Sequence, residues 1–274
     1  MAHPIIRSLT HLKGMHWPTV DPFLFCAHHV DGYPAGNADM HPVADLSGRN
    51  IGSDFSGKDG FSMYHGDGVP GFPRHPHRGF ETVTLARSGY IDHSDSLGAT
   101  ARFGHGDVQW MTAGKGIQHC EMFPLVHTDQ PNPTELFQIW MNLPASDKMV
   151  DPYFTMLWSG DIPKPAIPDE AGRTTTVTVI AGALGEHRGP RTPPNSWAAR
   201  PEAGVAIYTL KMEPRATYTL PAGPADAHRT LYFFAGDHVS ILGAAVPQGM
   251  AIGVEPGVDV PLVNHDQVAE ILVL

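Results

Sequence analysis

The sequence predicts an all-β fold, and three observations support this prediction. Short runs of β-branched and aromatic residues recur along the chain, most of them bounded by Gly, Pro, Asp or Asn. The 274 residues include 29 Gly and 26 Pro, so turns are frequent and long helices are not expected. No segment shows a strong helical periodicity. Many short strands with dense turns are typical of a β-sandwich or β-barrel.

The expected strands follow one another in both halves of the chain. They lie within residues 80–89, 99–104, 107–114, 135–144, 153–160, 176–182, 205–212, 216–221, 229–236, 238–243, 260–264 and 269–274. Residues 159–175 interrupt this series with a stretch rich in Pro, Gly and charge, which indicates a domain boundary. The two halves could therefore be related β-barrels, although no strong sequence repeat connects them.

Residues 33–70 form the other unusual region. This stretch is rich in Gly, Asp and Ser and is weakly apolar, so no regular structure is expected in it. A loop of this length inside a compact domain is either functional or mobile.

Charge and composition exclude several function classes. The net charge is −10 and the sequence pI is near 5.9, and no run of Lys or Arg forms a basic face, so direct nucleic-acid binding is disfavoured. Neither a signal peptide nor a membrane span is evident, and the two cysteines, Cys26 and Cys120, form no disulfide framework. A cytoplasmic location is therefore expected. The 17 histidines raise the expectation of a metal site.

Two histidine-containing dipeptide patterns carry the candidate site. In an extended strand, residues i and i+2 point to the same face, so His75 and His77 project together. His119 and Glu121 show the same spacing, with Cys120 between them facing the opposite side. Proline lacks an N–H, so the strand carrying Pro76 is expected at an edge or a strand end. If the two strands pair in one barrel, three imidazoles and one carboxylate meet at a common point.

This donor set favours a borderline divalent metal. Oxygen-only sites suit Mg or Ca, and thiolate sites suit structural Zn or Fe–S clusters. Three nitrogens and one oxygen suit Fe(II), Mn, Ni, Cu or Zn, and an octahedral ion held by four protein atoms keeps two open positions. The donor set by itself does not choose among these metals.

Longer segments extend the pattern around these residues. They read GFPRHPHRGFETVT, DSLG, GHGDVQWMTAGKGIQHCEM and LFQIWMNLP, preceded by DPFLF near the N-terminus. Together these segments resemble the signature segments of the pirin family, within the cupin superfamily. The close similarity covers residues 69–144, and a looser one continues through TVTVIAGALGE.

The resemblance implies a bicupin, with two stacked antiparallel β-barrels of the double-stranded β-helix (jelly-roll) type and few short helices. It implies an N-terminal metal-binding barrel over residues 1–160 and a C-terminal cupin-like barrel without metal ligands over 161–274. Residues 35–66 form an insertion relative to the usual pirin and could cover the mouth of the site. The implied ligands, usually of iron, are His75, His77, His119 and Glu121.

Other residues near the site have less specific interpretations. Glu81 shares the parity of His75 and His77, so it is interpreted as a carboxylate that orients the ligands. Direct ligation, or a salt bridge to Arg78 or Arg87, are the alternatives. His93 is expected to be a hairpin residue, and lone histidines in the second half are expected to be structural. Trp110, Met111 and Phe123 could wall a pocket, but a core role is the simpler expectation for each.

Two function classes follow from the resemblance. The first is an iron-dependent dioxygenase that acts on a flavonol-like, quercetin-type aromatic substrate with dioxygen, with Glu121 as the general base for the substrate hydroxyl. The second is a redox- or iron-responsive regulatory protein that binds a protein partner, as a transcription co-regulator does, without turnover. A metal-binding protein with neither activity is a third possibility.

Overall fold

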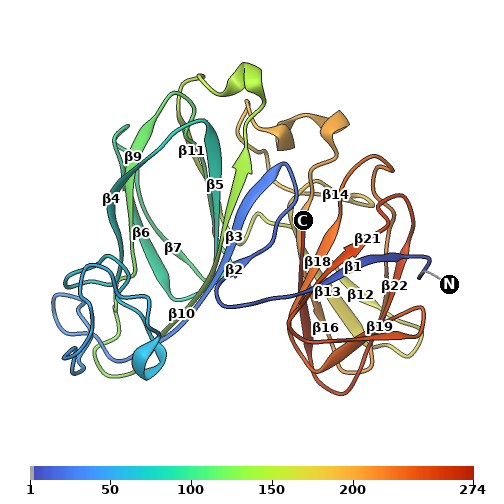
Figure 1. Cartoon of the computed structure of the whole chain (residues 1–274), viewed down its shortest axis with the longest axis horizontal. Helices are drawn as coiled ribbons and strands as arrows, with labels where there is room; N and C mark the ends of the chain where they lie inside the picture. The colour runs from blue at the N-terminus through green and yellow to red at the C-terminus, as the bar shows by residue number, and fades with distance from the viewer. Residues whose placement is uncertain (1–2) are drawn as a thin grey trace. The chain divides into compact units, whose positions relative to one another are not determined.

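The computed structural model describes residues 3–274, and its fold is almost entirely β-structure (Figure 1). This confirms the all-β prediction. The chain divides into two compact units: Cys26–Ser159 forms one, and the residues up to Phe25 together with Gly160–Leu274 form the other. The sequence-based ranges, 1–160 and 161–274, place the first 25 residues in the other half. They group with the C-terminal residues because their first strand pairs with a strand near the end of the chain.

The unit Cys26–Ser159 contains two sheets. One has the strand order β4-β9-β6-β7, and the other has the order β11-β8-β5-β10-β3, with β2 next to β3. The strands are β3 (Phe23–Tyr33), β4 (Gly71–His77), β5 (Phe80–Ser88), β6 (Tyr90–Asp95), β7 (Thr100–Gly104), β8 (Val108–Thr112), β9 (Ile117–Met122), β10 (Asn132–Asn142) and β11 (Tyr153–Leu157). The short strand β2 (His16–Trp17) and the first residues of β3 precede Cys26 and are counted with the other unit.

The other unit has a seven-stranded sheet, β1-β21-β18-β23-β16-β13-β12, a four-stranded sheet, β17-β22-β19-β20, and the short pair β14-β15. Apolar side chains from both large sheets form one core cluster. The strands are β1 (Ile6–His11), β12 (Ala166–Pro168), β13 (Thr174–Ala181), β14 (Ala183–Leu184), β15 (His187–Arg188), β16 (Ile207–Met212), β17 (Thr217–Leu220), β18 (Thr230–Ala235), β19 (His238–Ile241), β20 (Ala244–Pro247), β21 (Met250–Val254), β22 (Val260–Asn264) and β23 (Ala269–Val273).

Helical structure is confined to short 3₁₀ turns. Within residues 3–274 these are η1 (Lys58–Gly60), η2 (Ala145–Asp147), η3 (Trp197–Ala199) and η4 (Pro201–Ala203). No helix in this range is long and apolar enough to cross a membrane. Cys26 and Cys120 are free cysteines.

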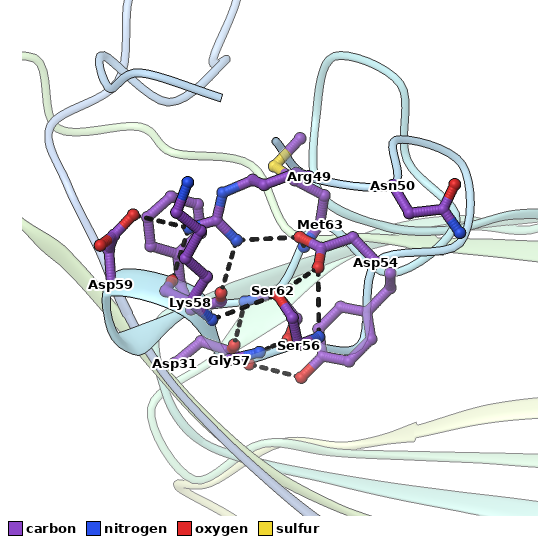
Figure 2. Close-up of polar contacts among 12 residues, drawn as sticks. Asp31, Arg49, Asn50, Asp54, Ser56, Gly57, Lys58, Asp59, Ser62 and Met63 are labelled. Atoms are coloured by element: carbon purple, nitrogen blue, oxygen red, sulfur yellow. Dashed lines mark hydrogen bonds and ion pairs between the residues drawn. The ribbon is translucent and has the colours of Figure 1, made fainter. Parts of the chain in front are cut away.

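The long segment between β3 and β4 has no strand and only the turn η1, as the sequence predicts. Figure 2 shows the polar network that orders it. The buried Arg49 guanidinium donates to the Asp54 carboxylate at 2.9 Å and to the backbone carbonyls of Phe61 and Lys58. It also lies over the Phe61 ring, 3.9 Å from the ring centre. The excursion therefore has a polar core of its own.

Two buried carboxylates of this region, those of Asp54 and Asp31, have pKa values shifted in opposite directions. Burial opposes ionisation of Asp54, but hydrogen bonds from Ser56, the Met63 N–H and Arg49 hold its pKa at about 2. Burial raises the pKa of Asp31 to about 6, although Asp31 accepts hydrogen bonds from the Tyr64 hydroxyl and the Ser62 N–H. The excursion is thus tied back to β3 through Asp31.

Aromatic contacts connect the excursion to β4. The Tyr64 ring stacks on Phe72 with centroids 5.1 Å apart, and Phe55 contacts both rings. The Phe72 ring in turn meets the His75 ring edge-on, at 6.4 Å. The excursion therefore reaches the first predicted ligand through one intervening side chain. Coverage of the mouth of the site stays a prediction.

Candidate metal centre

Strand pairing brings the two dipeptide patterns together on β4 and β9. β9 lies between β4 and β6 in its sheet, and His75 is directly opposite His119 in the β4–β9 register. β4 is an edge strand of this sheet, which agrees with its prolines because an edge strand can lack N–H donors on one side. Residues opposite each other in a sheet point to the same face, so the imidazoles converge.

The close approach of β4 to β9 has a local cause. Gly71 begins β4 with φ of 127°, and a Cβ atom there would lie 2.5 Å from the backbone carbonyl oxygen of Glu121. Glycine is therefore required at this position. A register shift between Phe72 and His75 adds a bulge, which lets both side chains face the site.

Three of the four predicted ligands meet at one point. One nitrogen from each of His75, His77 and His119 lies within 4.8 Å of the others. The Nε2 atoms of His75 and His77 are 3.1 Å apart, and the His75 and His119 ring centroids are 4.4 Å apart. His119 is only 1% exposed and His77 9%, whereas His75 is half-buried.

Hydrogen bonds indicate which nitrogen of His75 and of His119 faces the cluster. His75 Nδ1 lies 2.8 Å from the Pro73 carbonyl oxygen, so Nδ1 carries the hydrogen and Nε2 keeps its lone pair. On the other side, His93 Nε2 donates to Asp95 Oδ2 at 3.0 Å. His93 Nδ1 can then accept from His119 Nδ1, at 3.4 Å, which leaves the His119 Nε2 lone pair directed at the cluster.

The protonation state of the buried histidines suits a metal ligand. Burial lowers the pKa of His77 to about 3, and the neighbouring His119 and His75 add to the effect. Burial and the neighbouring His75 and His93 likewise lower the pKa of His119 to about 3. Both rings are therefore neutral at physiological pH, and a neutral imidazole is the form that binds a metal ion.

The residues present fit a bound divalent metal. His119 Nε2 is buried and has no hydrogen-bond partner within residues 3–274, a costly arrangement unless something else occupies the cluster. A cation coordinated by His75, His77 and His119 would satisfy this nitrogen. This three-histidine cluster can hold a metal ion.

Glu121 lies beside the cluster rather than within it. Its Oε2 is 4.0 Å from His119 Nε2. The carboxylate is 5% exposed and accepts hydrogen bonds from Thr84 Oγ1 at 2.8 Å and Gln138 Nε2 at 3.2 Å. Thr84 and Gln138 come from β5 and β10, in the facing sheet, so the site lies between the two sheets of this unit.

The other sequence interpretations have mixed outcomes. Glu81 is buried and accepts hydrogen bonds from Thr112 and Trp110, and it is outside the group of converging ligand atoms. Trp110, Met111 and Phe123 are at most 2% exposed, as expected for core residues.

Some contacts at the site were missed by sequence reasoning. His93 does lie in a hairpin, but its side chain also connects Asp95 to His119. The i, i+2 spacing of His93 and Asp95 was a usable signal for this contact. The sequence offered no signal for Thr84 or Gln138, because both lie on strands of the opposite sheet.

The fold and the converging histidines define a β-barrel protein of the cupin type with a candidate metal centre. Residues 7–141 match the family model described as Pirin. This part of the chain belongs to the pirin family, as its motifs predicted.

The matches to curated relatives cover only part of those proteins. The Pseudomonas aeruginosa protein named "Putative quercetin 2,3-dioxygenase" is 45% identical over 137 residues, which cover 49% of this chain and 47% of that protein. Human Pirin is 45% identical over 127 residues, which cover 46% of this chain and 40% of that protein. The chain therefore spans about half, or less, of the length of these relatives.

Solved structures with the same fold cover almost the whole chain. A quercetin 2,3-dioxygenase from Acinetobacter baumannii aligns with a TM-score of 0.74 at 23% identity, covering 99% of this chain and 86% of that one. The bacterial pirin YhhW from Escherichia coli, in complex with nickel(II), aligns with a TM-score of 0.51 at 15% identity. The alignment covers 97% of this chain and 98% of that one. At these identities the similarity shows the fold alone.

Proposed function

We propose that the protein is a metal-dependent dioxygenase that acts on a flavonol-like, quercetin-type aromatic substrate. The observation that carries this proposal is the convergence of three imidazole nitrogens within 4.8 Å, with the Glu121 carboxylate beside them. The name of the P. aeruginosa relative supports the reaction class. The other pirin relatives leave the substrate open, because a fold hosts many activities.

His75, His77 and His119 would hold the metal, with Glu121 as the fourth ligand. Fe(II) is the metal that we propose, and Mn, Ni, Cu or Zn suit the same donors. When bound, such a metal supplies Lewis acidity and, if redox-active, a route for electrons between an aromatic substrate and dioxygen.

Glu121 is also the base that we propose for the substrate hydroxyl. A carboxylate within hydrogen-bond reach of a metal-proximal hydroxyl can accept its proton. Thr84 and Gln138 each donate to one carboxylate oxygen, so they hold Glu121 in a fixed orientation while one lone pair of each oxygen stays available. Their contribution is therefore to position the base.

Aromatic side chains around the cluster favour a planar substrate. The Phe80 and Trp140 rings lie 5.1 Å and 5.5 Å from the His77 ring, and Phe72 lies beside His75. Such rings can stack with or meet the edge of an aromatic ligand. Tyr64 and Phe55 of the excursion pack against the Phe72 ring, so the excursion would influence which substrate is accepted.

The test measures metal content and oxygen consumption on the same preparation. Protein purified without added metal is analysed for metal, then loaded with Fe(II) and mixed with quercetin in an oxygen electrode. We expect oxygen uptake that is lost in His119→Ala together with the metal, and lost in Glu121→Gln with most of the metal retained.

Metal-loaded protein that consumes no oxygen with quercetin or related flavonols would contradict the enzyme proposal. Oxidation-dependent binding to a protein partner, measured on the same preparation, would then support the regulatory alternative. The metal-site proposal is judged separately, by the metal content of His119→Ala.

A further inference from the structure

A second cavity lies in the unit that has no histidine cluster. Its volume is about 1090 Å³, and it is lined by the segments joining β15 to β16 and β17 to β18, with residues 20–23 of the same unit. Proline and alanine are frequent in these segments, and the half-buried Trp197 adds an aromatic surface. The cavity therefore has apolar side chains in its wall that could contact the body of a small molecule, beside polar and charged ones.

Arginines outnumber acidic side chains by one in the lining of this cavity. Arg188, Arg191, Arg200 and Arg229 line it, against three acidic side chains, all of them solvent-exposed. Arg200 lies over the Trp197 ring, 5.0 Å from its centre. The excess of guanidinium groups favours an anionic ligand.

Arg229 is the most informative of the four. The residue is half-buried, and its Nη1 atom is buried without a hydrogen-bond partner. Within residues 3–274 no acidic side chain forms an ion pair with it. Asp259 acts on it only at longer range, and Asp259 Oδ1 already accepts the Ala222 N–H at 2.8 Å. A buried guanidinium without a counter-ion is costly, so its arrangement points to an absent anion.

One buried tyrosine hydroxyl near Arg229 also lacks a hydrogen-bond partner. The Tyr218 hydroxyl is buried without a partner and lies near enough to Arg229 to interact electrostatically with it. The Tyr208 hydroxyl, also near Arg229, donates to the Ala183 carbonyl at 2.6 Å. Burial lowers the pKa of Arg229, which is the expected effect of an uncompensated buried cation.

We propose that this cavity binds a small organic carboxylate, whose anionic group pairs with Arg229 and whose apolar body lies against Trp197 and the proline-rich wall. A planar guanidinium matches a carboxylate in a bidentate arrangement. One arginine with an unpartnered buried nitrogen balances a single negative charge, and the Trp197 ring and the prolines of the wall suit a ligand with an apolar body better than an inorganic anion. The unit that contains Gly160–Leu274 thus has a ligand-binding role of its own, independent of the metal centre.

The test uses sodium benzoate as the probe and the full chain as the protein. Benzoate is expected to bind in isothermal titration calorimetry and to raise the thermal unfolding midpoint, since a ligand that binds only the folded state stabilises it. Arg229→Met is expected to weaken binding by about tenfold or more, because a charge-assisted bidentate contact is lost. Arg191→Met, at an exposed position of the same cavity, is the matched control and should bind as the unmodified protein does.

Three results would overturn the proposal. They are no heat or midpoint shift with benzoate at millimolar concentration, an unchanged affinity in Arg229→Met, or equal effects of benzamide, which lacks the charge. Inorganic phosphate that binds as tightly as benzoate would overturn the carboxylate assignment. If Arg229→Met does not fold, Arg229→Lys keeps the charge without the bidentate geometry and should still weaken benzoate binding.

Discussion

His75 and His119 lie directly opposite each other on β4 and β9, with their ring centroids 4.4 Å apart. This pairing brings together two parts of the chain that are more than forty residues apart in sequence. Strand β9 also pairs with β6, and there Asp95 lies opposite His119. The candidate metal centre is therefore organised around one strand.

Replacing His119 with alanine should remove most of the bound metal. The variant loses the most buried of the three converging nitrogens and leaves two imidazoles, one of them half-buried. Elemental analysis after dialysis checks this, with His11→Ala, at an exposed position on β1, as the control. A full complement of metal in His119→Ala would mean that the ligand set is wrong.

Asp95→Asn should lower metal affinity without unfolding the protein. Asparagine can keep the turn hydrogen bonds that Asp95 Oδ1 accepts from the Leu97 and Ala99 N–H groups. Its NH₂ group cannot accept the hydrogen of His93 Nε2, so the His93 tautomer should reverse. His119 Nδ1 must then accept from His93, and the His119 hydrogen moves to Nε2, where the metal would bind.

We expect a loss of metal affinity of about 10- to 100-fold from Asp95→Asn. Competition with a chelator measures the affinity, and ¹⁵N chemical shifts of the histidines in the metal-free protein report the tautomer. Asp92→Asn is the matched control, because Asp92 is on the same strand and pairs instead with Arg102. Equal affinities for Asp95→Asn and Asp92→Asn would show that the Asp95–His93 contact does not position His119.

Arg49→Met should destabilise the protein by about 3–5 kcal/mol, because it leaves the buried Asp54 carboxylate without its cation. The comparison variant is Arg102→Met, which breaks an ion pair of partly exposed residues and should cost less than about 1 kcal/mol. Denaturant unfolding of both variants measures the difference. Similar values for the two would mean that the network in Figure 2 does not order the excursion.

The metal-free protein should lose stability as the pH falls from about 6.5 towards 3. In the unfolded chain His77 and His119 take up protons near pH 6.5. In the folded protein the pKa of each is about 3. The unfolded state therefore binds more protons in this window, and the free energy of unfolding falls with decreasing pH by up to about 1.4 kcal/mol per pH unit for each histidine.

Denaturant titrations at several pH values check this dependence, and the double variant His77→Gln/His119→Gln serves as the control. Its pH profile should be flatter than that of the unmodified protein over the same window. Parallel profiles would indicate that these two histidines are protonated equally well in the folded and unfolded states.

Local sequence patterns determined much of this protein. The segments expected as strands are strands, since alternation and turn residues act over a few neighbouring positions. The i, i+2 spacing placed His75 with His77, and His119 with Glu121, on common faces before any pairing was known. The absence of strands between residues 34 and 70 also followed from composition. Strands β1, β3, β6, β20 and β21 and the strands of two or three residues were not identified, because their runs lack a clear β pattern or are flanked by few turn signals.

Only the tertiary structure decided which strands meet and what the side chains contact. The register of β9 between β4 and β6, and the facing positions of Thr84 and Gln138, depend on pairing between distant segments. The grouping of the first 25 residues with the C-terminal half and the unpaired Arg229 likewise arise from long-range packing. A two-residue period fixes the face of a side chain but not its neighbour across the sheet, so these relationships could not be read from local sequence.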